Sequence, residues 1–168
     1  GGMLLSADDK GLTGLWFDGQ KYFAYGLVES EACEEQENPI LNEAKHWMDI
    51  YFSGKEPDFD LPISLSGTDF QKKVWGILCT IPYGKTMTYG QIAAQIAAEQ
   101  GAAHMSAQAV GGAVGHNPLS IIVPCHRVVG ANGSLTGYAG GIDRKVKLLT
   151  LEGVDMSRFF VPKKGTAL

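Results

Sequence analysis

The sequence is poor in the features of membrane proteins and of disulfide-stabilised proteins. Its 168 residues contain no apolar run of membrane-spanning length and no charged-then-apolar leader. The three cysteines have no paired spacing, and no Cys/His cluster has the spacing of a zinc site. Cys33 lies in an acidic run and is expected to be exposed, whereas Cys79 ends an amphipathic pattern and is expected in the core. These absences predict a soluble, cytoplasmic protein with no membrane association, metal or cofactor.

A strong net charge is also missing. The formal charge of −4 would discourage nucleic-acid binding, but it hides an asymmetry along the chain. Residues 1–66 hold 4 Lys and 13 acidic residues, for −9, whereas residues 67–168 hold 10 basic and 5 acidic residues, for +5. This split predicts that only the second part contacts phosphates, although chance segregation of charge on solvated surfaces is the alternative.

The first 62 residues are expected to form an acidic α/β domain. Two predicted strands, 12–17 and 21–26, flank Asp18-Gly19, a pair typical of a hairpin turn. A further strand near residues 3–6 begins so abruptly that a natural start further upstream is compatible with the pattern.

A helix follows the acidic run. Asn38 can cap it, Pro39 can occupy its first position, and Gly54 can stop it. No motif in this domain carries chemistry, so we expect it to act as a scaffold, and residues 55–66 to connect it to the next domain. The inward face should contain Ile40, Leu41, Ala44, Trp47, Met48, Tyr51 and Phe52.

Residues 63–168 are expected to form a mostly α-helical, winged helix-turn-helix-like domain. The stretches Thr68–Gln71 and Thr88–Gln91 have the pattern of capping boxes, and a third helix should run from Ser106 to just before Asn117. The last of three such helices meets DNA in a helix-turn-helix. The predicted inward faces are Phe70, Val74, Trp75, Ile77 and Leu78, then Ile92, Ala93, Ile96 and Ala97, then Ala109, Val110 and Ala113.

The pair Cys125-His126 is the strongest chemical signal in the chain. Residues 119–123 predict a buried extended segment that ends at Pro124 and delivers Cys125 at a fixed place. A cysteine attacks as thiolate, so it needs a base or a cation nearby, such as His126 or Arg127. Neighbours on an extended chain point opposite ways, so this chemistry requires a bridging water or a sharp bend, and a third group to orient the imidazole. A buried cysteine beside a satisfied histidine is the structural alternative.

Four stretches around this pair occur in a fixed order. They are residues 109–118 (AVGGAVGHNP), 124–128 (PCHRV), 133–141 (GSLTGYAGG) and 148–153 (LLTLEG). Together they closely resemble the O6-alkylguanine-DNA alkyltransferases, the methylated-DNA-protein-cysteine methyltransferases, over residues 67–153, and the preceding part resembles them more loosely.

The resemblance implies direct-reversal DNA repair. Cys125 would accept the alkyl group of O6-alkylguanine in duplex DNA irreversibly, once per molecule, with O4-alkylthymine as a further candidate substrate. A glutamate-histidine-water-cysteine relay maps onto Glu152, His126 and Cys125, and Asn117 matches a hinge asparagine. The implied partner is double-stranded DNA, bound by a monomer, with the target base flipped out of the stack.

The resemblance also implies a pocket for the flipped base. Tyr138 would donate to guanine N3, and Tyr89 would help to rotate the nucleotide at its phosphate. Lys145 would lie near the pocket, the carbonyls of Cys125 and Val128 would accept from the exocyclic amine, and the amide of Ala139 would donate to O6. Ala139 replaces a frequent serine, which leaves the backbone donor unchanged.

The expected DNA contacts come from the third helix and from Arg127. Small residues at Ala109, Gly111 and Gly112 let a phosphate backbone approach closely, although tight helix packing is the alternative. Where many relatives have an arginine that fills the gap left by the flipped base, this chain has Gln108, which is shorter and uncharged.

Two other function classes fit parts of the pattern. An alkyltransferase-like module would recognise lesions without chemistry, but such modules lack the acceptor thiol. A Cys-His hydrolase would use the same pair with turnover, and no separate feature of the chain requires it.

Overall fold

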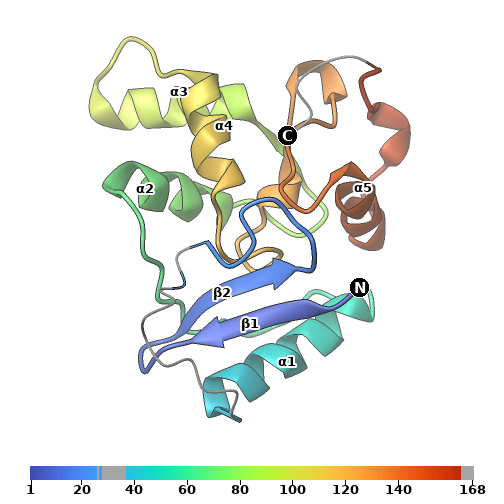
Figure 1. Cartoon of the computed structure of the whole chain (residues 1–168). Coiled ribbons are helices and arrows are strands. Elements are labelled where there is room, and N and C mark those ends of the chain that lie inside the picture. The colour runs from blue at the N-terminus through green and yellow to red at the C-terminus, as the bar shows by residue number, and fades with distance from the viewer. Residues whose placement is uncertain (26, 28–36, 164–168) are drawn as a thin grey trace.

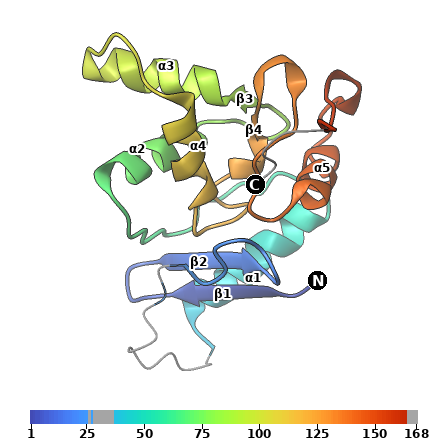
Figure 2. The ribbon, with the colours of Figure 1, turned by 45° about the horizontal axis from the view of Figure 1, so that its top comes forward.

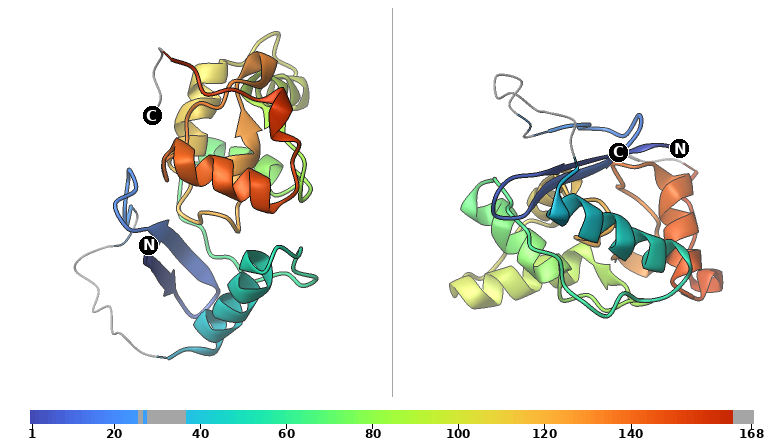
Figure 3. Two further views of the ribbon diagram at one scale, coloured as in Figure 1. Left: turned by 90° about the vertical axis from the view of Figure 1, so that its right-hand side faces the viewer. Right: turned by 90° about the horizontal axis from the view of Figure 1, so that it is seen from below.

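The computed structural model describes residues 1–25, 27 and 37–163, so the expectation for Cys33 concerns a residue outside the described ranges. A two-stranded sheet with one long helix forms one side of the molecule, and shorter helices form the other (Figures 1 and 3). This arrangement confirms the predicted fold class. Within the described ranges, no helix is both long and apolar enough to cross a membrane.

The sheet consists of β1 (Met3–Ala7) and β2 (Leu12–Phe17), which pair antiparallel with Met3 opposite Phe17. Asp8 closes the turn between them, because its Oδ1 accepts from the backbone amides of Lys10 at 2.8 Å and Gly11 at 2.9 Å. The hairpin partner of β2 is therefore β1, the strand that precedes it in the chain.

The predicted strand 21–26 is wrong for residues 21–25, which form turns with Tyr22 at φ 58° and Ala24 at φ 55°. The second edge of β2 is already occupied, since residues 62–64 and 118–120 form backbone hydrogen bonds to it. Because β1 pairs along the first edge of β2, neither edge of β2 is free for a strand that follows Asp18-Gly19.

Helix α1 (Pro39–Phe52) begins and ends as predicted. The side chain of Asn38 accepts from the amide of the second helical residue at 2.7 Å. Ala44 and Tyr51 are fully buried, and most of the other inward positions are half-buried. Phe52, expected on the inward face, is 46% exposed because it directly follows the buried Tyr51 and so lies about 100° from it around the helix.

The C-terminal part contains helices, short 3₁₀ turns and one pair of very short strands. Both predicted capping boxes are present, at Thr68 with Gln71 and at Thr88 with Gln91. Strands β3 and β4 pair in parallel (Figure 2). In chain order the elements are α2 (Asp69–Leu78), β3 (Met87–Thr88), α3 (Tyr89–Gln100), α4 (Ala107–Gly115), η1 (Cys125–Arg127), β4 (Val128–Val129), η2 (Ala131–Gly133), α5 (Ile142–Leu151) and η3 (Met156–Arg158).

Two inward-face predictions are wrong. Helix α4 buries Val110, Ala113 and Val114, a spacing of three and four residues that defines one face, so Ala109 is left exposed. Cys79 directly follows the last residue of α2 and is exposed, because the helical stripe no longer faces the core at that position.

Residues 119–123 are buried as predicted, but they do not form a strand. Leu119 makes one bridge to Leu15, and the chain then turns tightly, with Ile121 at φ 71° and a hydrogen bond from Ile122 N to Ser120 O at 2.9 Å. A β-branched residue at positive φ is strained, and here the surrounding core holds it. This turn brings the residues that follow α4 close to Cys125.

The contact between α2 and α4 can be tested with Trp75→Phe. The Trp75 indole is 1% exposed and its Nε1 donates to the Ala113 carbonyl at 2.9 Å. Phenylalanine keeps the apolar ring but leaves that buried carbonyl without its donor, so we expect a loss of about 1–3 kcal/mol in unfolding free energy. Urea unfolding should show a lower midpoint at an unchanged slope. The matched control, Phe52→Leu on an exposed aromatic, should stay near wild type, and equal midpoints for both variants would contradict the prediction.

Candidate active site

Cys125 begins the 3₁₀ turn η1, which supplies the sharp bend that the chemistry requires. The residue is 4% exposed, and the side-chain amide Nδ2 of Asn117 lies 3.0 Å from its sulfur. A hydrogen bond donated to sulfur favours the thiolate over the thiol. Among the described residues, no direct hydrogen bond joins the thiol to His126.

Asn117 holds the whole loop between α4 and Cys125. Its Nδ2 also contacts the carbonyls of Leu119 at 3.2 Å and Val123 at 2.8 Å, and its Oδ1 accepts from the Leu119 amide at 3.0 Å. One buried amide thereby fixes both ends of the turn that positions the sulfur.

His126 is fully buried and pairs with Glu152 at the end of α5. Its Nε2 lies 2.7 Å from Oε1 of Glu152. Its other ring nitrogen, Nδ1, is buried and has no hydrogen-bond partner among the described residues. Buried polar atoms are normally paired, so this nitrogen is available to a group that enters the site.

Arg127 completes the surroundings of Glu152. Its Nε and Nη2 donate to the two carboxylate oxygens at 2.9 and 3.0 Å, and its Nη1 donates to the Ile81 carbonyl at 2.6 Å. The expectation that Arg127 contacts DNA is therefore corrected. Its side chain is 11% exposed, and its donors face the interior because a buried carboxylate is the stronger partner.

These contacts set the protonation states of the resting site. Burial opposes ionisation of Glu152, but hydrogen bonds from His126 and Arg127 lower its pKa to about 2. Burial lowers the pKa of His126 despite the neighbouring carboxylate, so the ring is neutral. Burial likewise raises the pKa of the Cys125 thiol, against the opposing effects of Asn117 and Lys145. The resting site is a protonated thiol beside a neutral imidazole.

Three other expected site residues surround the segment after Cys125. Tyr138 is buried, and its hydroxyl has no partner among the described residues. The carbonyls of residues 136–137 accept from Lys145 Nζ at 2.7 Å and from the Tyr89 hydroxyl at 2.9 Å. Burial lowers the pKa of Lys145 to about 8. Lys145 and Tyr89 thus anchor the loop that carries Tyr138.

Val128 and Ala139 offer backbone groups beside these side chains. Val128 is fully buried in β4 and pairs with Met87 of β3. Ala139 is half-buried, and its carbonyl accepts from the Lys21 amide of the N-terminal part at 3.0 Å.

The expected DNA-contacting residues of α4 lie on its outer face. Gln108, Ala109 and Gly112 are exposed, and Gly111 is half-buried, with its Cβ position 3.9 Å from the Tyr89 ring. Gly112 has open space where a Cβ would stand, so it can admit a close backbone approach.

Tyr51 is a residue that the sequence analysis missed at this site. It lies in the last turn of α1, a helix to which only a scaffold role was assigned, and its hydroxyl donates to Glu152 at 2.7 Å. The one available signal was chemical, because a tyrosine on a buried face usually directs its hydroxyl to a polar partner.

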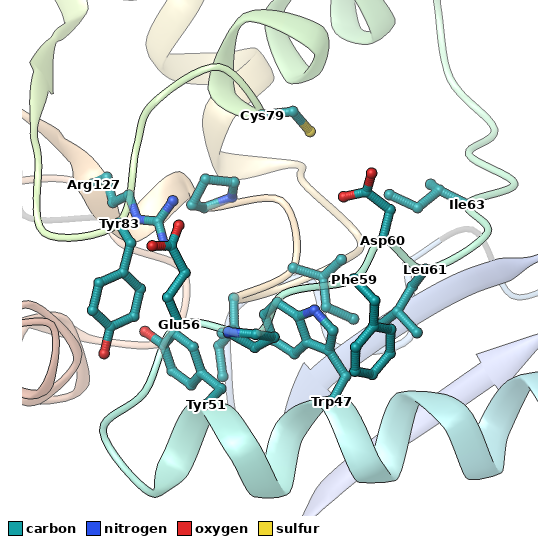
Figure 4. Close-up of a pocket in the computed structure, with 14 residues that line it drawn as sticks. Trp47, Tyr51, Glu56, Phe59, Asp60, Leu61, Ile63, Cys79, Tyr83 and Arg127 are labelled. Carbon is teal, nitrogen blue, oxygen red and sulfur yellow. The ribbon is translucent and has the colours of Figure 1, made fainter.

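A cavity of about 370 Å³ lies between α1, the connecting segment and η1 (Figure 4). Its lining includes Trp47, Tyr51, Tyr83 and Arg127 but not Cys125, so it is not the site of the thiol. The thiol itself is nearly closed to solvent. Within the described ranges, no group of three or more His, Cys, Asp or Glu side chains could hold a metal ion.

The packed helices α3 and α4 make this a protein of the helix-turn-helix type, and the same part of the chain contains the buried Cys125 thiol and the His126-Glu152 pair. Comparison with known proteins specifies the family. Residues 1–65 match the model "6-O-methylguanine DNA methyltransferase, ribonuclease-like domain", and residues 69–154 match the model of the DNA binding domain with the same name. The chain belongs to the 6-O-methylguanine DNA methyltransferase family.

Individual relatives agree with this assignment. A methylated-DNA-protein-cysteine methyltransferase of Mycobacterium tuberculosis is 59% identical over 105 residues, which cover 62% of this chain and 61% of the relative. One from Methanosarcina barkeri is 45% identical over 153 residues, 90% of each chain. The crystal structure of Mycobacterium tuberculosis OGT in complex with DNA is 44% identical, with a TM-score of 0.74, and the match covers 94% of this chain and 88% of that chain.

Glu152 should make the stability of the fold depend on acid. Its pKa of about 2 lies below the ordinary 4.5, so its stabilising effect is complete above about pH 5 and is lost as the pH falls toward 2. The shift corresponds to a loss on the order of 3 kcal/mol.

Glu152→Gln should be less stable than wild type near neutrality and should lose less of its stability on acidification. Urea unfolding from about pH 6 to about pH 3 measures this. The control Glu99→Gln removes an exposed partner of Lys73 and should change the pH dependence far less, because solvent screens an exposed ion pair. An unchanged acid slope in Glu152→Gln would contradict the assignment of a charged, stabilising carboxylate.

Proposed function

We propose that this protein repairs O6-alkylguanine in duplex DNA by transferring the alkyl group irreversibly to Cys125. The observation that carries the proposal is the buried Cys125 thiol, which is held by Asn117 and followed in the chain by His126. The Nε2 atom of His126 pairs with Glu152, and its Nδ1 has no hydrogen-bond partner among the described residues. Family membership supports the same reaction, since the relatives are named methylated-DNA-protein-cysteine methyltransferases.

The chemistry begins with a proton transfer. The thiol proton of Cys125 passes through a bridging water to Nδ1 of His126, and Glu152 stabilises the imidazolium that forms. The thiolate attacks the alkyl carbon, so a carbon-sulfur bond forms while the bond from carbon to guanine O6 breaks. The departing guanine takes up a proton. The product is a thioether, in which the sulfur is a poor leaving group, so each molecule acts once.

Recognition of the base rests on groups around the thiol. The unpartnered hydroxyl of Tyr138 is suited to donate to guanine N3, the carbonyls of Cys125 and Val128 to accept from its exocyclic amine, and the amide of Ala139 to donate to O6. Lys145 and Tyr89 hold the loop that carries Tyr138. A guanine O6 inside a duplex cannot reach a buried thiol, so the base must leave the stack.

DNA binding is assigned to the basic C-terminal part. The exposed face of α4 is suited to the groove, with Gly111 and Gly112 at the closest approach and Gln108 at the space left by the flipped base. We further propose that the protein works as a cytoplasmic monomer and that O4-alkylthymine is a second substrate. We also propose that the boundary between the two domains lies between residues 62 and 63.

Intact-mass measurement after incubation with methylated duplex separates this function from its two rivals. Product should stop at one equivalent, and the mass of the Cys125 peptide should increase by one methylene unit. Cys125→Ser should abolish transfer but keep duplex affinity, which should fall steeply with salt. Binding with an unchanged mass would instead indicate a recognition module, and product beyond one equivalent would indicate a hydrolase.

Gln108 can be tested through the cost of base flipping. Extrusion costs a few kcal/mol, part of which must be offset by the residue that fills the gap. Gln108→Ala should slow single-turnover transfer from duplex by roughly threefold to tenfold, a loss of about 1 kcal/mol, but hardly change transfer from the free base. Gln108→Arg should equal or exceed wild type on duplex.

The control for this experiment is Gln95→Ala, which removes an exposed glutamine from α3. Equal slowing on duplex and on the free base by Gln108→Ala would show that this residue shapes the pocket and has no part in flipping.

A further inference from the structure

Tyr51 links the N-terminal part of the chain to the proton path of the thiol. The residue is fully buried, and its hydroxyl lies 2.7 Å from Oε1 of Glu152 and 3.3 Å from Nε2 of His126. Figure 4 shows it projecting from α1 toward Tyr83 and Arg127. Three polar atoms from distant parts of the sequence therefore meet at one point.

The directions of these hydrogen bonds follow from the available protons. The Tyr51 hydroxyl has one proton, and the charged carboxylate at 2.7 Å is a better acceptor than a ring nitrogen at 3.3 Å. Burial, and then the charge of Glu152, raise the pKa of Tyr51, so the phenol stays protonated. Toward His126 the phenol oxygen is left only as an acceptor.

Both oxygens next to Nε2 of His126 are thus acceptors, which requires Nε2 to carry the ring proton. The neutral ring then has its lone pair on Nδ1, the buried atom without a partner among the described residues. Nδ1 is therefore the ring nitrogen that is left to accept a proton. Tyr51 and Glu152, which lie next to Nε2, therefore determine which nitrogen of His126 acts as the base.

We propose that Tyr51 is a positioning residue for alkyl transfer, which holds Glu152 and the Nε2-protonated ring of His126 so that Nδ1 serves as the base. The expected effect on the rate of alkyl transfer rests on the proposed function. The expected tautomer of His126 does not. It gives the N-terminal part a direct share in activating the thiol.

Removal of the hydroxyl should have two effects. Oε1 of Glu152 accepts from Tyr51, His126 and Arg127, so the loss of one donor leaves more of the negative charge to the imidazole. The pKa of His126 should rise, by roughly half a unit to one unit. The carboxylate and the ring also lose a constraint, which should slow transfer roughly tenfold, as for other groups that orient a functional histidine.

The other titratable or charged groups that face His126 remain in place in the variant. They belong to the turn η1, to the loop before α5, to α5 itself and to the residue that follows α5. They are the same in wild type and in both variants, so they do not affect the comparison. These groups are Cys125, Arg127, Tyr138, Lys145 and Glu152.

The test compares Tyr51→Phe with Tyr83→Phe in the full chain. Tyr83 lies beside Tyr51, with ring centroids 6.0 Å apart, but its hydroxyl reaches only the Leu151 carbonyl at 3.4 Å. NMR of histidine labelled with nitrogen-15 reports the tautomer and the titration of His126, and single-turnover assays report transfer. Tyr51→Phe should shift the titration upward and slow transfer, whereas Tyr83→Phe should do neither.

An unshifted titration with an unchanged transfer rate in Tyr51→Phe would overturn the proposal. So would a wild-type His126 whose proton lies on Nδ1, a result that does not require the variant to fold. In a Glu152→Gln background the effect of Tyr51→Phe should largely disappear, and full additivity would count against action through the carboxylate. If wild type transfers no alkyl group, the proposed function fails, while the tautomer and titration still test Tyr51.

Discussion

The site depends on keeping one buried carboxylate charged. Removal of Glu152 from water costs several kcal/mol, and this cost is offset only because five hydrogen bonds point at its two oxygens. The donors come from α1, from the loop at Gly84 and from η1. The carboxylate is therefore the partner of the imidazole and also one of the places where the two parts of the chain are joined.

Burial gives the site a protected resting state. The thiol and the imidazole are both neutral at rest, because a charged form of either would be poorly solvated. In the proposed reaction the thiol is consumed, so this resting state would protect it, since a protonated thiol reacts slowly with stray electrophiles. In that reaction the Asn117 amide beside the sulfur and Nδ1 of His126 would stabilise the charges that appear during transfer.

Much of the fold was predictable because the signals are local. The caps at Asn38, Thr68 and Thr88 each involve atoms within three residues, so their patterns could be read directly. The predictions failed where segments that are distant in the sequence compete for the same strand edge. The strand expected at residues 21–26 finds the edge of β2 occupied, and residues 119–123 turn because one backbone bridge to β2 is all they can make.

The sequence by itself determined the order of the motifs and, through their family resemblance, the prediction of Cys125 as nucleophile with His126 and Glu152 beside it. Only the tertiary structure decided what surrounds them. The donors of Arg127 face Glu152 in the interior, and Tyr51 reaches a carboxylate 101 residues away. The physical reason is that hydrogen-bond partners so far apart are selected by packing and by the cost of a buried charge, neither of which leaves a periodic trace along the chain.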